Sequence, residues 1–390
     1  MTNRYDAANQ FANRPADESF GTLAGFLAHL RDEKQISRET TRAIKDIRAN
    51  PHTNGGIVLT SRGPDGQERS GHLTHWAFGQ MARTINAPAG YLRSLPADIT
   101  AAATNFGISK VARQDLKILA KKAGQAEPTI IRAITSTSYS RVWSADLYGD
   151  LAEHLTPRGF DLPPVWPHLD KHGTGKAGAY AGDRDAFLIL ALPESSIVHD
   201  PTARRSRVPL PMGINPSHDD GAMFPAIIVK NSDVGASSVT IELIYIRYIC
   251  GNHILWGVET GSSWKRRHVG QNAQRDSVRE VLRLSAALAD HNPADIERMI
   301  KTLAEREIAN TKDGVIEELR ALGYSEADAK TAYEATETEQ SSTTASPRSF
   351  WGIVQGTTYA SQQTGYQDER FTLDQLAAKV LTKGRALVAA

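Results

Sequence analysis

Short apolar segments in the middle of the chain constrain its fold more than any other feature of the sequence. Residues 186–190, 226–229 and 239–250 are rich in Ile, Val and Leu, and an earlier segment, 129–134, has the same β-branched character. Turn-forming residues separate these segments. Runs of this length and composition predict strands. We therefore expect these four segments to form one sheet.

Helical spacing of apolar residues precedes and follows these strands. Residues 19–48 predict one or two amphipathic helices, 74–85 a helix capped by Thr74, and 98–122 a further helix. Beyond Gly270 the pattern is helical only. The predicted helices of this last part are 277–290, 293–310, 313–322, 325–336 and 372–387.

This order of elements predicts an α+β fold, in which a central antiparallel or mixed sheet is flanked by helices and followed by a helical C-terminal part. The length of 390 residues suits two or three domains. We expect an N-terminal helical and hairpin region at 1–125. A β-rich core with a strand-turn-helix unit follows at 126–270, and a helical region at 271–390.

Charge and cysteine content exclude several classes of protein. The 45 Lys and Arg residues nearly balance the 44 Asp and Glu residues, so any nucleic-acid surface must be local. Cys250 is the single cysteine, which excludes an intramolecular disulfide and a zinc site built from cysteines. The polar N-terminus and the short apolar runs predict neither export nor a membrane span. We expect a cytoplasmic protein without membrane partners.

Several stretches of the chain resemble the phage/plasmid-like protein family known as domain of unknown function 932. They are residues 73–80, 87–92, 131–136, 230–238 and 246–253. The most specific feature is a turn, here called the family turn, that leads into a strand ending in Cys-x-Asn. Its residues are Asn231, Ser232, Asp233 and Gly235, followed by Cys250 and Asn252.

This chain departs from the family pattern at Val142-Trp143, where members carry a basic residue and aspartate, and at His253, where Gly or Thr is common. The resemblance implies a mobile-element setting near recombination and replication functions. It implies no established activity and no cofactor.

A basic stripe is the strongest candidate site that follows from the residues themselves. On a helix that turns about 100° per residue, Lys110, Arg113, Lys117 and Lys121 lie on one face. Such a face can follow the phosphates of a nucleic acid. The alternative is a solvated helix face that contributes only solubility.

A second basic cluster, Lys265, Arg266 and Arg267, follows Trp264. Cations beside an aromatic ring suit a single-strand binder, because bases stack on the ring while the cations hold the backbone. Trp264 or Tyr139 could provide that ring, and Arg132 and Arg141 are secondary candidates. Trp264 could equally anchor its loop to the core.

The family turn allows two interpretations. Its Asn, Ser and Asp side chains bond to nearby amides and Gly235 permits a positive φ, so the segment could expose N–H groups to a phosphate. The same residues also suit a well-capped connection between two strands.

A metal-dependent nuclease or other phosphoryl-transfer enzyme is the rival hypothesis. His218, Asp219 and Asp220 are consecutive, and His253 could join them at a divalent ion. A third possibility is a protein-interaction factor that works through the C-terminal helices. The preferred prediction is a non-enzymatic accessory protein of a phage, plasmid or other mobile element that binds single-stranded DNA.

Overall fold

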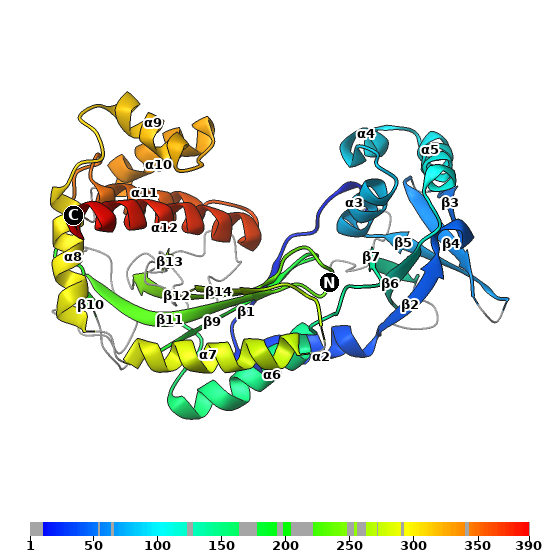
Figure 1. The fold of residues 1–390 in the computed structure, drawn as a ribbon, viewed down its shortest axis with the longest axis horizontal. Helices are drawn as coiled ribbons and strands as arrows, with labels where there is room; N and C mark the ends of the chain where they lie inside the picture. The colour runs from blue at the N-terminus through cyan, green and yellow to red at the C-terminus, as the bar shows by residue number, and fades with distance from the viewer. Residues whose placement is uncertain are drawn as a thin grey trace.

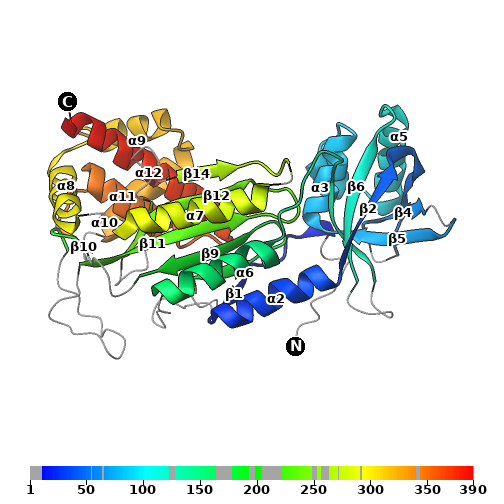
Figure 2. The same ribbon diagram turned by 60° about the horizontal axis from the view of Figure 1, so that its bottom comes forward.

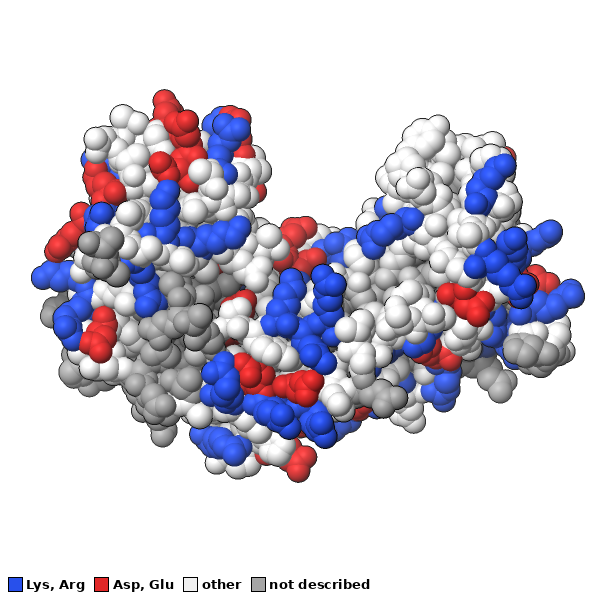
Figure 3. All heavy atoms as spheres, in the orientation of Figure 1, with Lys and Arg blue, Asp and Glu red and all other residues white. Residues whose placement is uncertain are grey.

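Two lobes separated by a hollow form the computed structural model of the chain (Figures 1 and 3). The structure describes residues 11–53, 55–63, 66–122, 128–163, 178–192, 198–203, 221–247, 253–255, 263–270, 272–289, 292–339 and 343–389. The small lobe holds a six-stranded sheet and three helices. The large lobe holds an eight-stranded sheet and the remaining helices. This architecture confirms the predicted α+β class.

The sheet of the small lobe has the strand order β2-β6-β7-β5-β4-β3. Its strands are β2 (Ser37–Ala43), β3 (Ile47–Pro51), β4 (Ile57–Arg62), β5 (Glu68–Leu73), β6 (Asp115–Lys121) and β7 (Ile130–Ser136). Only the β5–β7 pair is parallel among these neighbours. Helices α3 (His75–Thr84), α4 (Ala89–Ser94) and α5 (Ala97–Lys110) complete the lobe. Thr74 caps α3, as predicted, by accepting a hydrogen bond from the amide of Ala77 at 3.1 Å.

The predicted helix 98–122 is wrong beyond residue 110. Helix α5 ends at Lys110, and Val111 takes an extended conformation. Leu116 and Ile118 then alternate with polar residues and join the core of the small lobe from strand β6. The alternation of buried and polar side chains every second residue fits a strand, and pairing with β2 and β7 on either side holds the segment in that conformation. Lys117 and Lys121 therefore lie on a strand, and the basic helical stripe does not exist.

The predicted helical region 19–48 is also only partly helical. Helix α2 (Leu23–Gln35) begins after Thr22, whose hydroxyl accepts from the amide of Gly25 at 3.1 Å. The chain then enters the mostly exposed strand β2, a short 3-10 turn (Ile44–Asp46) and β3. An edge strand with few apolar residues lacks the alternation that identifies strands in a sequence.

The sheet of the large lobe has the order β1-β8-β9-β11-β12-β13, and β10 and β14 pair with β11 and β12. Its strands are β1 (Glu18–Phe20), β8 (Ala179–Ala181), β9 (Ala186–Ala191), β10 (Val198–His199), β11 (Ala222–Asn231), β12 (Val239–Arg247), β13 (His253–Leu255) and β14 (Ser263–Arg266). Three of the four predicted strands are here, whereas the fourth is β7 of the small lobe. The expectation of one four-stranded sheet is therefore wrong.

Helices cover both faces of this sheet (Figure 1). Helices α2, α6 (Ser144–Leu155) and α7 (Ala273–Ala289) share one core with it. On the opposite face lies α12 (Gln367–Ala389), whose Phe371 ring is 5.8 Å from the ring of Phe187 in β9. A 3-10 turn (Thr156–Arg158) extends α6.

The C-terminal part is helical, as predicted. It contains α8 (Pro293–Glu305), α9 (Lys312–Ala321), α10 (Glu326–Glu339), α11 (Phe350–Ser361) and α12. The sequence pattern did not indicate α11. Every residue from Phe350 to Thr358 is buried, and this run of about two and a half turns covers all faces of the helix. A helix buried on all sides carries no amphipathic period.

The small lobe is inserted into the large one. The chain leaves the large lobe after α2 and returns at α6, and Figure 2 shows these two helices side by side. The Lys34 ammonium and an Asp146 carboxylate oxygen are 2.5 Å apart, which joins the exit to the return. The domain boundaries expected at 125 and 270 remain a prediction.

Candidate functional site

A groove of about 740 Å³ opens on the sheet of the small lobe, and we call it the basic groove. Apolar side chains from four strands line its floor. They are Ile47, Leu59, Ile118, Ala120 and Ile131. Gly71 of β5 also lies there, and a Cβ atom at this position would come within 2.8 Å of the Ile131 side chain. The glycine thus allows the Ile131 side chain to pack closely against β5.

Positive charge surrounds the basic groove. Five cations and one acid line it, namely Arg38, Arg42, Arg69, Lys121, Lys122 and Glu39. Arg38 and Arg42 are four residues apart on β2, an even spacing, so their side chains leave the strand on the same face. Figure 3 shows Lys and Arg side chains on the outer side of this lobe, around β4.

The two arginines of β2 bond to neutral groups. Arg38 donates to the carbonyls of Gln35 and Ser37 at 2.8 Å, and Arg42 to that of Thr41 at 2.7 Å. The Nε atom of Arg42 is buried and has no hydrogen-bond partner among the described residues. Neither guanidinium is paired with a carboxylate of the described chain, so both charges remain available to an anion.

Glu33 of α2 pairs with two of the sequence-predicted cations. Its carboxylate lies 3.0 Å from the Lys121 ammonium and 3.6 Å from the Arg132 guanidinium. Burial tends to raise the pKa of Glu33, but the charges of Arg132 and Lys121 outweigh it and hold the pKa below its ordinary value. Burial lowers the pKa of Lys121.

Glu39 of β2 pairs with two further cations that the sequence predicted as phosphate-binding residues. It lies 3.7 Å from Lys117 and 2.5 Å from Arg141, and Lys117 also donates to the carbonyl of Tyr139 at 2.8 Å. Four of the predicted phosphate-binding residues are therefore engaged with carboxylates between or near the lobes.

The remaining predicted cations are scattered. Lys110 ends α5, 5.1 Å from the ring of Phe106, and Arg113 is exposed before β6. Lys265 and Arg267 are exposed on the large lobe, where Arg266 pairs with Asp276 at 3.3 Å. The structure does not unite these residues in one surface.

The two aromatic candidates make contacts within the protein. Tyr139 stacks on His268, with ring centroids 5.1 Å apart, and its hydroxyl donates to the carbonyl of Ser232 at 2.8 Å. Trp264 of β14 is half-buried against the core of the large lobe. Their rings are only partly accessible to a base.

The side chains of the family turn bond to their surroundings. Asn231 donates to the carbonyl of Val142 at 2.9 Å, and Asp233 accepts from the amide and the hydroxyl of Ser144 at 2.8 Å. Ser232 accepts from the amide of Ala236 at 2.9 Å. Gly235 has a φ of 74°, the positive value expected from its residue type. Cys250 and Asn252 lie outside the described residues.

The family turn also joins the lobes. The carbonyl of Val234 accepts hydrogen bonds from the Trp76 indole at 3.1 Å and from the Gln80 side chain at 2.8 Å, both on α3. This contact accounts for the conformation of the turn without a bound anion.

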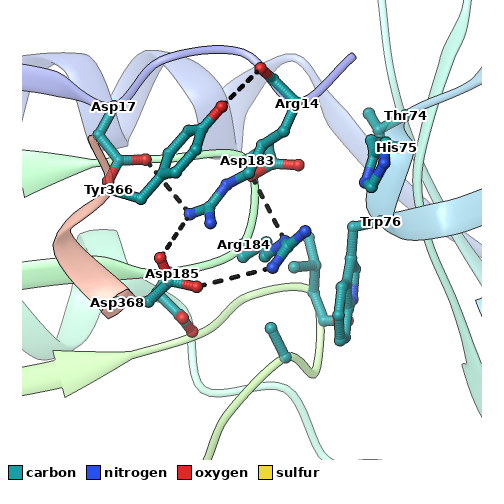
Figure 4. A network of polar contacts seen from close by, with 12 residues as sticks. Arg14, Asp17, Thr74, His75, Trp76, Asp183, Arg184, Asp185, Tyr366 and Asp368 are labelled. Carbon is teal, nitrogen blue, oxygen red and sulfur yellow. Dashed lines mark hydrogen bonds and ion pairs between the residues drawn. The ribbon is translucent and has the colours of Figure 1, made fainter. Parts of the chain in front are cut away.

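A second polar network lies at the same junction (Figure 4). The Arg14 guanidinium is 3.1 Å from Asp183, 2.8 Å from Asp368 and 3.6 Å from Asp17, and it stacks on Tyr366 at 3.8 Å. These residues tie the N-terminal segment to the β8–β9 turn and to the start of α12. They are far apart in the sequence, so no local pattern indicated them.

The network continues toward the small lobe. Arg184 lies 3.7 Å from Asp368 and 5.4 Å from the centre of a Trp76 ring. Burial raises the pKa of Asp183 to about 6. Burial, together with the charges of Arg93 and Arg184, lowers the pKa of His75 to about 4. The junction therefore favours the neutral form of His75, whereas Asp183 remains mainly ionised at neutral pH.

The residues of the enzymatic hypothesis cannot be placed. His218, Asp219 and Asp220 lie outside the described residues, and only the backbone of His253 is described, in β13. In the part of the chain that is described, no three His, Cys, Asp or Glu side chains are grouped so as to hold a metal ion. None of the described helices is long and apolar enough to cross a membrane.

Fold and site together define an α+β protein of two sheet-centred lobes, with a basic groove on one lobe and a polar junction between them. The chain belongs to the family described as domain of unknown function (DUF932), whose model matches residues 177–378. No curated protein and no solved structure matches it. The matched residues carry β8 to β14 and the C-terminal helices, so the groove lies outside them.

Proposed function

We propose that this chain is a non-enzymatic protein that binds single-stranded DNA in the basic groove, as an accessory factor of a mobile element in the cytoplasm. The observation that carries this proposal is the combination of an apolar floor with five cations and one acid around it, although one of the five, Lys121, is paired with Glu33. The groove replaces the helical stripe as the binding surface.

The floor suits the flat faces of unpaired bases. The half-buried Ile36 and Ala120 offer apolar area to a base that is no longer stacked on a neighbour, above the buried side chains of Ile47, Leu59 and Ile118. Among the described residues none of those lining the groove is aromatic, so contact with the bases would be aliphatic.

The rim suits the phosphates of the same strand. Arg38 and Arg42 follow one edge of the sheet, and guanidinium groups bind phosphate oxygens with paired hydrogen bonds. The base faces of a duplex are stacked on one another, so a duplex could contact only the cations at the rim of the groove. The groove should therefore favour single strands over duplexes.

A salt-titrated binding assay tests the proposal. Fluorescence anisotropy would follow a labelled oligothymidylate and a duplex of equal length, with and without magnesium, so that cleavage is seen in the same samples. We expect the double variant Arg38→Glu/Arg42→Glu to bind the single strand at least tenfold more weakly. Its salt slope should fall by about one for each phosphate that the variant no longer neutralises.

The matched control is Lys265→Glu/Arg267→Glu, which changes the charge equally on exposed residues of the large lobe. It should bind like the parent. Equal weakening in both double variants would mean a nonspecific charge effect and would refute the groove. Equal affinity for the duplex and the single strand would refute the preference for single-stranded DNA. Binding to anionic lipid vesicles but to neither DNA would mean that the groove binds an amphiphile.

A further inference from the structure

A separate cavity of about 260 Å³ lies between the two lobes. The large lobe lines it with the N-terminal segment, α2 and the β8–β9 turn, whereas the small lobe contributes Thr74, Lys121 and Arg132. Pockets for small molecules measure about 300–1,000 Å³, so this volume suits a ligand of a few heavy atoms. Such a ligand would touch both lobes at once.

Asp183 gives this cavity an unused acceptor. Its side chain is only 4% exposed, and its Oδ1 atom accepts from the Nε of Arg14 at 3.1 Å. The Oδ2 atom is buried and has no hydrogen-bond partner among the described residues. Figure 4 shows Asp183 facing Thr74 and His75 across the junction. A buried carboxylate oxygen without a donor costs free energy, which a bound donor would recover.

Acidic side chains outnumber basic ones in the lining of the cavity. Four carboxylates line it, from Glu18, Asp32, Glu33 and Asp183, against the two cations Lys121 and Arg132. Both cations pair with the same acid, Glu33. His29 lies 3.7 Å from Glu18. Asp183 already pairs with Arg14 at 3.1 Å and lies 3.9 Å from Arg184, both through its Oδ1 atom, so its Oδ2 atom and the exposed Asp32 are the acceptors that remain for a ligand.

We infer that the inter-lobe cavity binds a small organic dication of the diamine class, with one ammonium group donating to Oδ2 of Asp183 and the other directed to the Asp32 side. The carboxylate takes up the first ammonium without moving, because Arg14 already fixes its other oxygen. The ligand stabilises the two lobes in the arrangement described here.

Calorimetric titration of the full chain with 1,4-diaminobutane tests this inference in the absence of nucleic acid. We expect saturable binding and a rise in the melting temperature with diamine concentration. The neutral analogue 1,4-butanediol, which has similar size and shape, should produce neither. Equal effects of the two compounds, or no saturable effect of the diamine, would overturn the inference.

Two variants locate the site. Asp183→Asn keeps an acceptor for Arg14 and should weaken diamine binding at least tenfold. Asp32→Asn alters an exposed residue and should weaken diamine binding several-fold. The control is Asp368→Asn, because Asp368 also pairs with Arg14 but does not line the cavity. Parental affinity in the Asp32 variant, or equal weakening in the Asp368 variant, would contradict the assignment.

Since the oligonucleotide assay concerns another cavity and other variants, failure of one proposal leaves the other intact.

Discussion

The side chain of Gln80 joins the lobes at the carbonyl of Val234, to which its Nε2 donates over 2.8 Å. Its Oε1 accepts from the backbone amide of Ile134, also at 2.8 Å. One buried carboxamide thus connects helix α3, strand β7 and the family turn. The directional geometry of a hydrogen bond makes this a specific joint, whereas apolar contact alone would allow sliding.

Replacing Gln80 with leucine should therefore destabilise the protein. The amide of Ile134 would be left without its acceptor in a buried place, which costs about 1–3 kcal/mol. Urea unfolding followed by tryptophan fluorescence measures the change, and the unfolding of the two lobes should begin to separate. The variant Gln114→Leu, at an exposed position, should stay within about 0.5 kcal/mol of the parent. Equal stability of the Gln80 variant would show that the joint contributes nothing.

Glu242 makes the stability of the protein depend on pH at values above the ordinary pKa of a glutamate. Burial raises the pKa of this β12 carboxyl from 4.5 to about 7. Between these values the folded chain holds a proton that the unfolded chain releases, so stability falls as pH rises. Glu242→Gln removes this dependence and should be more stable than the parent at pH 8 by on the order of 3 kcal/mol.

Thermal unfolding at pH 4 and pH 8 checks this expectation. The gain should vanish at pH 4, where both states carry the proton. Glu305→Gln, at an exposed helix position, should show no such pH-dependent gain. A Glu242 variant that parallels the parent at every pH would rule out the raised pKa.

His268 has the opposite effect on the acid side. Burial lowers its pKa from 6.5 to about 4. The unfolded chain therefore binds a proton in this interval that the folded chain resists, and stability decreases as pH falls from 6.5 toward 4. His268→Phe keeps a flat ring against Tyr139 and should flatten the stability profile across this interval.

Denaturant midpoints at pH 7, 5.5 and 4 would reveal this change. The exposed His154→Gln serves as the control and should retain the slope of the parent. An unchanged slope in the His268 variant would mean that other groups cause the acid sensitivity.

Gly356 allows α11 to approach α10 closely. A Cβ atom at this position would lie 2.5 Å from the carbonyl oxygen of Ala332, so the helices would have to separate. Overpacking of this kind costs about 1–3 kcal/mol or more. Gly356→Ala should lower the free energy of unfolding by that amount. Gly365→Ala, where nothing lies within 4 Å, should not, and equal stability of both variants would disprove the close approach.

The fold could be predicted from the sequence where residue type and period agreed. Strands β9, β11 and β12 are almost wholly buried and apolar, β11 and β12 are rich in β-branched residues, and the cap at Thr74 begins its helix as local chemistry requires. Strand β6 was missed because Lys117 and Lys121 are four residues apart, a helical spacing, and partners distant in sequence determine the strand. Three-residue strands such as β1 and β8 depend on their pairing, β1 with β8 and β8 with both β1 and β9.

The candidate site was less accessible to sequence reasoning. Arg38, Thr40 and Arg42 alternate along β2, and this pattern would have indicated one cationic face if the segment had been interpreted as a strand. No such signal exists for Glu33 and Glu39, which neutralise cations from β6, β7 and the loop after β7. Ion pairs between distant parts of the chain depend on tertiary position. Such pairs engage four of the residues that the sequence predicted to contact phosphates.

The insertion of one lobe into the other sets an order for assembly during synthesis. All strands of the small-lobe sheet lie within residues 37–136, so this sheet can close before β8 at Ala179–Ala181 has left the ribosome. Strand β1 can pair only after its partner β8 has been synthesised. Helix α2 likewise needs later parts of the chain to complete the core against which it packs. The small lobe can therefore fold before the large lobe is complete. The Lys34–Asp146 pair then holds α2 beside α6, the helix at which the chain re-enters the large lobe.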